Sequence, residues 1–186
     1  EQLSIAVNVC PSLLLENDIL SVVTDALEIF GVAPARLHLE VTEKIMIANQ
    51  DMMLGQLARL RKIGVKISID DFGTGYASLT HLKRLPLAQL KIDRSFVADM
   101  LTSPRDAAIA RAVVELGRSM GLTVIAEGVE TQAQRDLLAE YGCHVFQGNL
   151  FGQSAPVETL RQEALRSFVE PQGADDPPPA APASRA

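Results

Sequence analysis

The strongest constraint on the fold is a regular alternation of short β-type runs with longer segments of helical spacing. The β-type runs lie at residues 3–9, 36–41, 65–70, 88–92, 123–126 and 144–146. Apolar residues recur every three or four positions in the segments that follow these runs, which predicts helices at residues 17–30, 51–63, 76–82, 105–120, 131–141 and 156–168. Glycines stand at expected helix C-caps, at Gly31, Gly64, Gly121 and Gly142. With strands interpreted as apolar on both faces, the pattern predicts an α/β protein with a parallel sheet, either open and doubly wound or closed into a barrel.

The positions of polar residues favour the barrel. Nearly every predicted strand ends in a polar residue, and these are Asn8, Glu40, Asp70 with Asp71, Asp93 just past Lys91, Glu127 and Gln147. In a doubly wound sheet such residues gather at one switch point, whereas in a barrel all strand ends meet in one ring. The sequence therefore predicts a TIM-like (β/α) barrel with an active site on that ring.

The length predicts that only part of this barrel is present. A barrel of this type has eight βα units in about 250 residues, and six units can be counted here. We therefore expect residues 1–168 to form a partial domain that lacks about two N-terminal units. Residues 169–186 are rich in Pro and Ala and are expected to be a disordered tail.

Composition excludes several kinds of partner. A net charge of −6 and a pI near 5.1 argue against a nucleic-acid polymer or an anionic membrane surface, since both require a basic face. An anionic substrate would therefore need bridging cations. No apolar run approaches the ~18 residues that span a bilayer. Cys10 and Cys143 are interpreted as buried thiols in a reducing compartment, which favours the cytoplasm.

The acidic residues at the strand ends predict a metal site. Carboxylates from Glu40, Asp70, Asp71 and Glu127, with the amide oxygen of Asn8, would form an all-oxygen site suited to Mg²⁺ or Mn²⁺. Two such ions could bridge a phosphodiester and activate a water as the nucleophile. The alternative for any single acidic residue is a helix cap or a solvated loop, but adjacent carboxylates at a buried strand end are costly without a cation.

Two further residues of the ring have candidate catalytic roles. Lys91 could orient the water or offset charge on the phosphoryl oxygens, and Gln147 could hydrogen-bond the water or the substrate. The alternative for Lys91 is one half of a structural ion pair with Asp93 or Asp70.

The segment 71–76 joins a strand end to a helix and is either a mobile loop over the site or an ordinary tight turn. Glu43 and Glu130, three residues beyond Glu40 and Glu127, could hold loops in place through hydrogen bonds to backbone. Thr42 and Thr131 could equally be plain helix caps.

Five motifs resemble those of the EAL-domain phosphodiesterases over residues 3–160. They are Leu39-Glu40-Val41-Thr42-Glu43, the run from Asp70 to Leu79, the run from Leu90 to Val97, Ala126-Glu127-Gly128-Val129-Glu130-Thr131, and Gln147-Gly148. The resemblance implies hydrolysis of cyclic di-GMP to linear pGpG with Mg²⁺ or Mn²⁺. It also implies a homodimer and an upstream sensory or GGDEF-type segment in the parent protein.

The resemblance also implies roles for individual residues. Asn8, Glu40, Asp70, Asp71 and Glu127 would be metal ligands, and Lys91 and Gln147 would act with Glu127 on the water. Glu43 and Glu130 would support the loop that contains Gly73, Thr74 and Gly75, and Asp93 with Arg94 would lie beside metal and substrate.

The sequence departs from the family in ways that leave two alternatives open. The earlier strand that carries the family's Glu-Ala-Leu metal-ligand segment is expected to be missing from this sequence, together with the Arg-rich segment after it. His144, Asn149, Gln153 and Ser154 replace the usual residues of the last motif. One alternative is a degenerate module that binds cyclic di-GMP or a protein without catalysis. The other is that these 186 residues are inactive alone, since an open six-stranded barrel has unpaired edges.

Overall fold

A computed structural model describes residues 3–15, 19–43, 50–74 and 79–160. The strands are β1 (Ile5–Asn8), β2 (Leu37–Thr42), β3 (Lys66–Phe72), β4 (Gln89–Ile92), β5 (Thr123–Ala126) and β6 (Val145–Phe146). The helices are α1 (Pro11–Leu15), α2 (Ile19–Phe30), α3 (Gln50–Lys62), α4 (Leu79–Leu82), α5 (Arg94–Ala98), α6 (Pro104–Ser119) and α7 (Gln132–Tyr141), with a 3₁₀ turn η1 (Pro34–Arg36). All six predicted strands are confirmed within two residues at each end.

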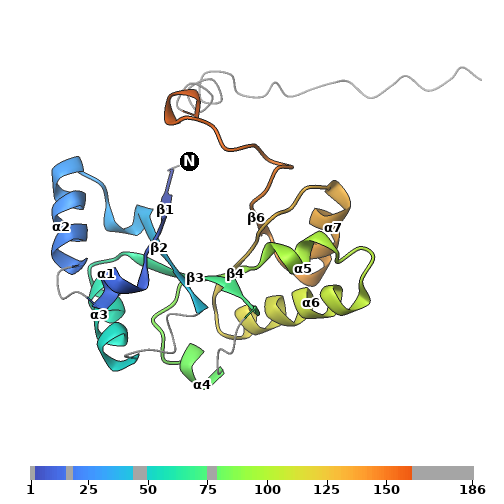
Figure 1. Ribbon diagram of the computed structural model, residues 1–186, viewed down its shortest axis with the longest axis horizontal. Coiled ribbons are helices and arrows are strands. Elements are labelled where there is room, and N and C mark those ends of the chain that lie inside the picture. Colours follow the sequence, from blue (N-terminus) through green and yellow to red (C-terminus); the bar gives the residue numbers. More distant parts are fainter. Residues whose placement is uncertain (1–2, 16–18, 44–49, 75–78, 161–186) are drawn as a thin grey trace, which may run out of the picture. The chain divides into compact units, whose positions relative to one another are not determined.

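The strands form one parallel sheet in the order β1-β2-β3-β4-β5-β6. A doubly wound sheet reverses its strand order at a switch point, and this sheet has no reversal. The sheet is therefore part of a TIM-like barrel, as predicted. In Figure 1, α1, α2 and α3 lie beside the first strands, and α5, α6 and α7 lie beside the later ones.

The chain divides into two compact units, residues 1–152 and 153–186. The six-stranded sheet belongs to the first. In the second, residues 157–160 are helical, which agrees with the start of the helix predicted at 156–168. The rest of that predicted helix, the tail at 169–186 and residues 76–78 of another predicted helix lie outside the described residues. Among the described residues, no helix is long and apolar enough to cross a membrane.

The prediction that the strands are apolar on both faces is wrong for β2, β3 and β4. Their sequences alternate apolar and polar residues, as in Leu37-His38-Leu39-Glu40-Val41-Thr42. The apolar set, which includes Leu39, Ile67 and Leu90, belongs to the hydrophobic core with residues of α3 and α6. The polar set shares the opposite face, because side chains alternate along a strand. That face carries the strand-end residues predicted from the sequence.

Helix ends follow the local chemistry of the sequence. Ser103 caps α6 with Pro104 in its first turn, and Thr131 caps α7 in a reciprocal capping box with Gln134. Gly142 ends α7 with φ of 95°, a conformation that favours glycine. Sequence periodicity missed α1 and α5, since each has only five residues. The expectation of two buried thiols is correct for Cys143 and wrong for Cys10, which is exposed just after β1.

Close contact between α6 and β5 yields the first prediction. A Cβ at the buried Gly117 would lie 2.3 Å from Cγ2 of Val124, whereas a Cβ at Gly55 of α3 would have no neighbour within 4 Å. We expect Gly117→Ala to destabilise the fold by about 1–3 kcal/mol through overpacking. Gly55→Ala should stabilise it by about 0.5–1 kcal/mol, because Ala is the better helix former. Chemical denaturation measures both.

Adding Val124→Ala to Gly117→Ala removes the clashing methyl groups and should recover part of the loss. A Gly117→Ala protein as stable as the unmodified one would contradict this packing.

Candidate functional site at the strand ends

The parallel register brings the predicted polar residues to one end of the sheet. Glu40 lies near the end of β2, Asp70 lies near the end of β3, and Lys91 is the next-to-last residue of β4. Glu127 follows β5 directly, and its backbone N–H still donates to the carbonyl of Ile92. Four neighbouring strands therefore deliver one side chain each to a common rim.

The ammonium of Lys91 is the centre of this rim. Its Nζ lies 2.8 Å from Oε1 of Glu40, 3.2 Å from Oδ1 of Asp70 and 2.5 Å from Oε1 of Glu127. The Lys91 side chain is only 3% exposed, and the three carboxylates are 10–16% exposed. An ammonium has three N–H donors, so the number of carboxylates around Lys91 matches the number of its donors. The predicted pair with Asp70 is present, but with two further partners and without Asp93.

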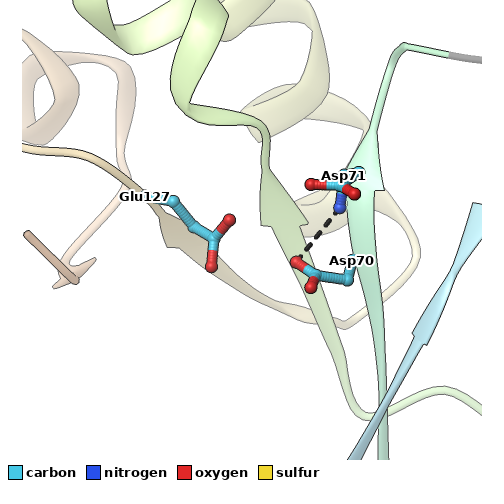
Figure 2. Close-up of side chains that lie close together, drawn as sticks. All are labelled: Asp70, Asp71 and Glu127. Carbon is cyan, nitrogen blue, oxygen red and sulfur yellow. Dashed lines mark hydrogen bonds between the residues drawn. The ribbon is translucent and has the colours of Figure 1, made fainter. Parts of the chain in front are cut away.

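An irregularity in β3 brings Asp71 to the same side as Asp70. Adjacent residues of a regular strand point to opposite faces. Between Ile69 and Phe72, β3 has one more residue than the facing part of β4, and Asp71 has φ of 53°. This bulge re-aims the side chain, which is a common effect of such irregularities. Ligand oxygens of Asp70, Asp71 and Glu127 consequently lie within 4.8 Å of one another, and Figure 2 shows Glu127 facing the two aspartates.

The electrostatics of the rim leave an excess of negative charge. When ionised, Glu40, Asp70, Asp71 and Glu127 carry four negative charges against the single positive charge of Lys91. Burial disfavours the ammonium, but hydrogen bonds to Glu127 and Glu40 outweigh it and raise the pKa of Lys91 above its usual range. Burial also raises the pKa of Glu127, and the charges of Asp70 and Glu40 add to this against the effect of Lys91.

Asp71 has the least compensated charge of the group. Burial raises its pKa, and so do the neighbouring charge of Asp70 and the hydrogen bond between its carboxyl group and that of Asp93. Burial opposes ionisation of Asp93 as well, but hydrogen bonds from Ser95 lower the pKa of Asp93. A cation beside Asp71 would therefore relieve an unfavourable arrangement.

The donor set fits a hard divalent cation. All the candidate ligand atoms are oxygens, and no His or Cys among the described residues joins the carboxylate group. Oxygen ligands suit Mg²⁺, Mn²⁺ or Ca²⁺, whereas zinc prefers nitrogen and sulfur. The spacing of the three carboxylates and the excess charge agree with the predicted metal site.

Of the two glutamates predicted to hold the loop after β3, Glu43 contacts it. Oε2 of the buried Glu43 accepts a hydrogen bond from the backbone N–H of Gly73 at 3.2 Å. Thr74 turns back on Asp71, whose carbonyl accepts from the Thr74 hydroxyl at 2.9 Å. Gly75 lies outside the described residues. Glu130 is exposed, and its backbone N–H donates to the side chain of Gln134.

Four further predicted residues lie around the rim, and of these Asp93 is hydrogen-bonded to the carboxyl group of Asp71. Asn8 is exposed on the edge strand β1, in register with Glu40. Gln147 is exposed just after β6, and its backbone joins the segment after β5 by accepting from the Val129 N–H. Asp93 caps α5 through the Ser95 N–H, and Arg94 is exposed at the start of that helix.

Sequence reasoning missed a buried polar layer one pleat below the charged one. Oε1 of Gln89 lies 2.6 Å from Nδ1 of His38 and accepts from the Ser68 hydroxyl at 2.7 Å. These residues precede Lys91, Glu40 and Asp70 by two positions, which places them on the same face. The alternation of polar residues along β2, β3 and β4 was the signal that could have revealed this layer.

Comparison with known proteins agrees with the motifs. The family model described as EAL domain matches residues 1–154. The cyclic di-GMP phosphodiesterase NbdA of Pseudomonas aeruginosa is 46% identical over 168 residues, which cover 90% of this chain and 21% of NbdA. The chain thus spans about a fifth of the length of this curated relative.

Solved structures share the fold. The PaMucR phosphodiesterase in its c-di-GMP complex matches with a TM-score of 0.81 and 45% identity, over 84% of this chain and 64% of that one. Klebsiella pneumoniae BlrP1, in a manganese and cy-diGMP complex, matches with a TM-score of 0.75 and 36% identity, over 81% of this chain and 38% of that one.

The buried ammonium gives the second prediction. In Lys91→Met three carboxylates lose their shared cation, and we expect a loss of about 3–5 kcal/mol in the free energy of unfolding. Mg²⁺ should restore part of that stability by replacing the lost charge. Thermal unfolding with and without Mg²⁺ measures both effects.

The matched control is Arg84→Met. Arg84 pairs with Asp51 on the surface, where the side chains are 56% and 92% exposed, so little stability should change. Equal effects of the two substitutions would contradict the structural role of Lys91.

The third prediction concerns Asp71. Asp71→Asn removes a carboxyl group whose pKa is raised in the fold. Asn tolerates the positive φ at this position, and its amide can donate to Asp93. Because a raised carboxyl pKa destabilises the fold once the group ionises, the melting temperature should rise at pH 7. The gain should vanish below the ordinary Asp pKa of 3.8. Thermal unfolding of metal-free protein across pH tests this, and a gain that persists at low pH would contradict it.

Proposed function

The chain belongs to the EAL domain family, and from this premise we propose that it contributes to a metal-dependent phosphodiesterase that hydrolyses cyclic di-GMP to linear pGpG. The observation that carries the proposal is the rim of four carboxylates, three of which pair with the buried Lys91 ammonium while Asp71 lies beside Asp70 and Glu127. Such a rim is incomplete electrostatically without cations, and a phosphodiester is an anion that cations can bridge. Relatives whose names state this activity or complex support the choice of substrate.

The proposed ligands of two Mg²⁺ or Mn²⁺ ions are Asn8, Glu40, Asp70, Asp71 and Glu127. When bound, these ions supply charge to the phosphodiester oxygens and make a water more acidic. Lys91 fixes the oxygens of Glu40, Asp70 and Glu127 and adds positive charge where negative charge develops on the phosphoryl group.

The remaining roles belong to residues around the rim. The exposed amide of Gln147 hydrogen-bonds the water or the substrate, and the guanidinium of Arg94 pairs with a phosphate oxygen. Asp93 lies beside Asp71 and supports it. Glu43 supports the loop that contains Gly73, Thr74 and Gly75 through its hydrogen bond with the Gly73 N–H. Glu130 is proposed as a second support of that loop.

Binding without turnover is the competing function. The residues that depart from the family pattern, His144, Asn149, Gln153 and Ser154, are all exposed, as residues that contact a nucleotide base would be. A module changed only at these residues would keep its metal ligands and alter how the base is held.

The proposal extends to the whole protein. We propose a partial domain over residues 1–168 with a tail at 169–186, a cytoplasmic location, a homodimer, and an upstream sensory or GGDEF-type segment. The relative MucR of Pseudomonas aeruginosa, named a bifunctional diguanylate cyclase and cyclic di-GMP phosphodiesterase, supports the last point.

The fourth prediction tests the activity in the complete protein. With Mg²⁺ or Mn²⁺ we expect conversion of cyclic di-GMP to pGpG, followed by chromatography, and its loss after addition of a chelator. Glu127→Gln should lower the rate by more than about 100-fold, since even outer partners of metal ligands cost 10–100-fold. Arg84→Met serves as the control with unchanged turnover.

Two outcomes would overturn the proposal. Tight binding of cyclic di-GMP without any product in the unmodified protein would establish the binding module instead. Equal turnover of the unmodified protein and Glu127→Gln would mean that the rim is not the catalytic site.

A further inference from the structure

Two segments that leave the rim lie against each other. One follows β4 and contains Asp93 and α5, and the other follows β5 and leads through Glu127 and Gly128 to α7. A Cβ at Gly128 would come within 2.7 Å of Cβ of Arg94 and 3.4 Å of its Cα. The two segments therefore touch with no room for a side chain next to Glu127.

Gln134 joins the same two segments farther from the rim. Its side chain is buried, with 5% exposed. Oε1 accepts from the backbone N–H groups of Glu130 and Thr131, both at 2.9 Å. Nε2 donates to the carbonyl oxygens of Val97 at 3.1 Å and Ala98 at 3.3 Å, at the end of α5. Both donors and both acceptor positions of the amide are in use.

Only the bond from the Thr131 N–H belongs to the capping box of α7, and the bond from the Glu130 N–H likewise needs only an oxygen. A capping box needs an oxygen at this position, and Glu serves as well as Gln. The two bonds to α5 need the amide nitrogen. They connect the helix that Asp93 caps with the segment that begins at Glu127, and Lys91 and Glu127 are themselves in contact at the rim.

We propose that Gln134 is a positioning residue that fixes Glu127 relative to Lys91 and Asp93 and thereby sets the affinity of the rim for divalent cations. This inference rests on the proposed function, since it assumes that the rim binds Mg²⁺ or Mn²⁺. Gln134 touches neither the carboxylates nor the substrate in this role. It acts through the backbone of Glu130 and Thr131 on one side and of α5 on the other.

The test uses Gln134→Glu in the complete protein. Glu keeps the capping box and nearly the same volume but places an oxygen against the carbonyls of Val97 and Ala98. We expect the affinity for Mn²⁺ in the absence of substrate to fall about 10–100-fold, the range seen when groups outside the metal ligands are changed. The electron paramagnetic resonance signal of free Mn²⁺ measures this binding directly. The Mn²⁺ concentration for half-maximal hydrolysis should rise with it, while turnover at saturating Mn²⁺ changes less.

The matched control is Ser103→Ala, which removes the cap of α6 away from the rim. It should lower the melting temperature without a change in Mn²⁺ binding. A second variant, Gln134→Met, keeps the length of the side chain and adds no buried charge. It should weaken Mn²⁺ binding as Gln134→Glu does, and it replaces Gln134→Glu in the test if that variant does not fold.

The outcomes separate this inference from the proposed function. If the Gln134 variants lower only the melting temperature, as Ser103→Ala does, the positioning role is overturned. If the unmodified protein binds Mn²⁺ but does not hydrolyse cyclic di-GMP, the proposed function fails while the effect of Gln134 on Mn²⁺ binding is still measured. If it binds no Mn²⁺, both fail.

Discussion

The buried ammonium of Lys91 is the interaction on which the rest of the site depends. Glu40, Asp70 and Glu127 come from three different segments, and their carboxylates would repel one another without a shared cation. Removing one partner of a buried ion pair costs roughly 3–5 kcal/mol, because the other charge is left unpaired. Loss of Lys91 would therefore leave all three carboxylates without their cation. The parallel register places the partners, and Lys91 makes that placement stable.

The strands themselves show why such a site can exist in a sheet covered by helices. Strands of parallel sheets usually read as continuous apolar runs, and barrel interiors are usually filled by branched aliphatic residues. Here β2, β3 and β4 alternate, with the apolar residues in the core with the helices and the polar residues on the opposite face. The hydrogen-bonded layer of His38, Ser68 and Gln89 lies below the layer of Lys91 and the carboxylates, and it contributes oriented polar groups where aliphatic side chains would be expected.

Sequence alone located the strands, their barrel order and most of the rim, because strand ends in a barrel must converge whatever the details of packing. It placed Glu40, Asp70, Asp71, Lys91 and Glu127 together, and the structure agrees. It could not reveal that Lys91 has three partners, since this depends on side-chain reach across β3 and β5. The bulge at Asp71, the cap formed by Asp93 and the bonds from Gln134 to α5 are likewise results of tertiary contact that no local periodicity encodes. The exposure of Cys10 was not foreseen, because Cys10 lies between β1 and α1 and periodicity missed the short helix α1.

The structure divides the site into satisfied and unsatisfied groups, and the division has a functional meaning. Lys91 is paired with three carboxylates, and the Gln134 amide makes four hydrogen bonds, so these two side chains form a fixed frame. Asp71 is the opposite case, with a positive φ, a like charge beside it and a raised pKa. Strain of this kind persists only where the surroundings hold it, and it is concentrated at functional sites. A cation that binds beside Asp71 would offset the repulsion between Asp71 and Asp70, so a group that is unfavourable in the fold alone would become favourable on binding.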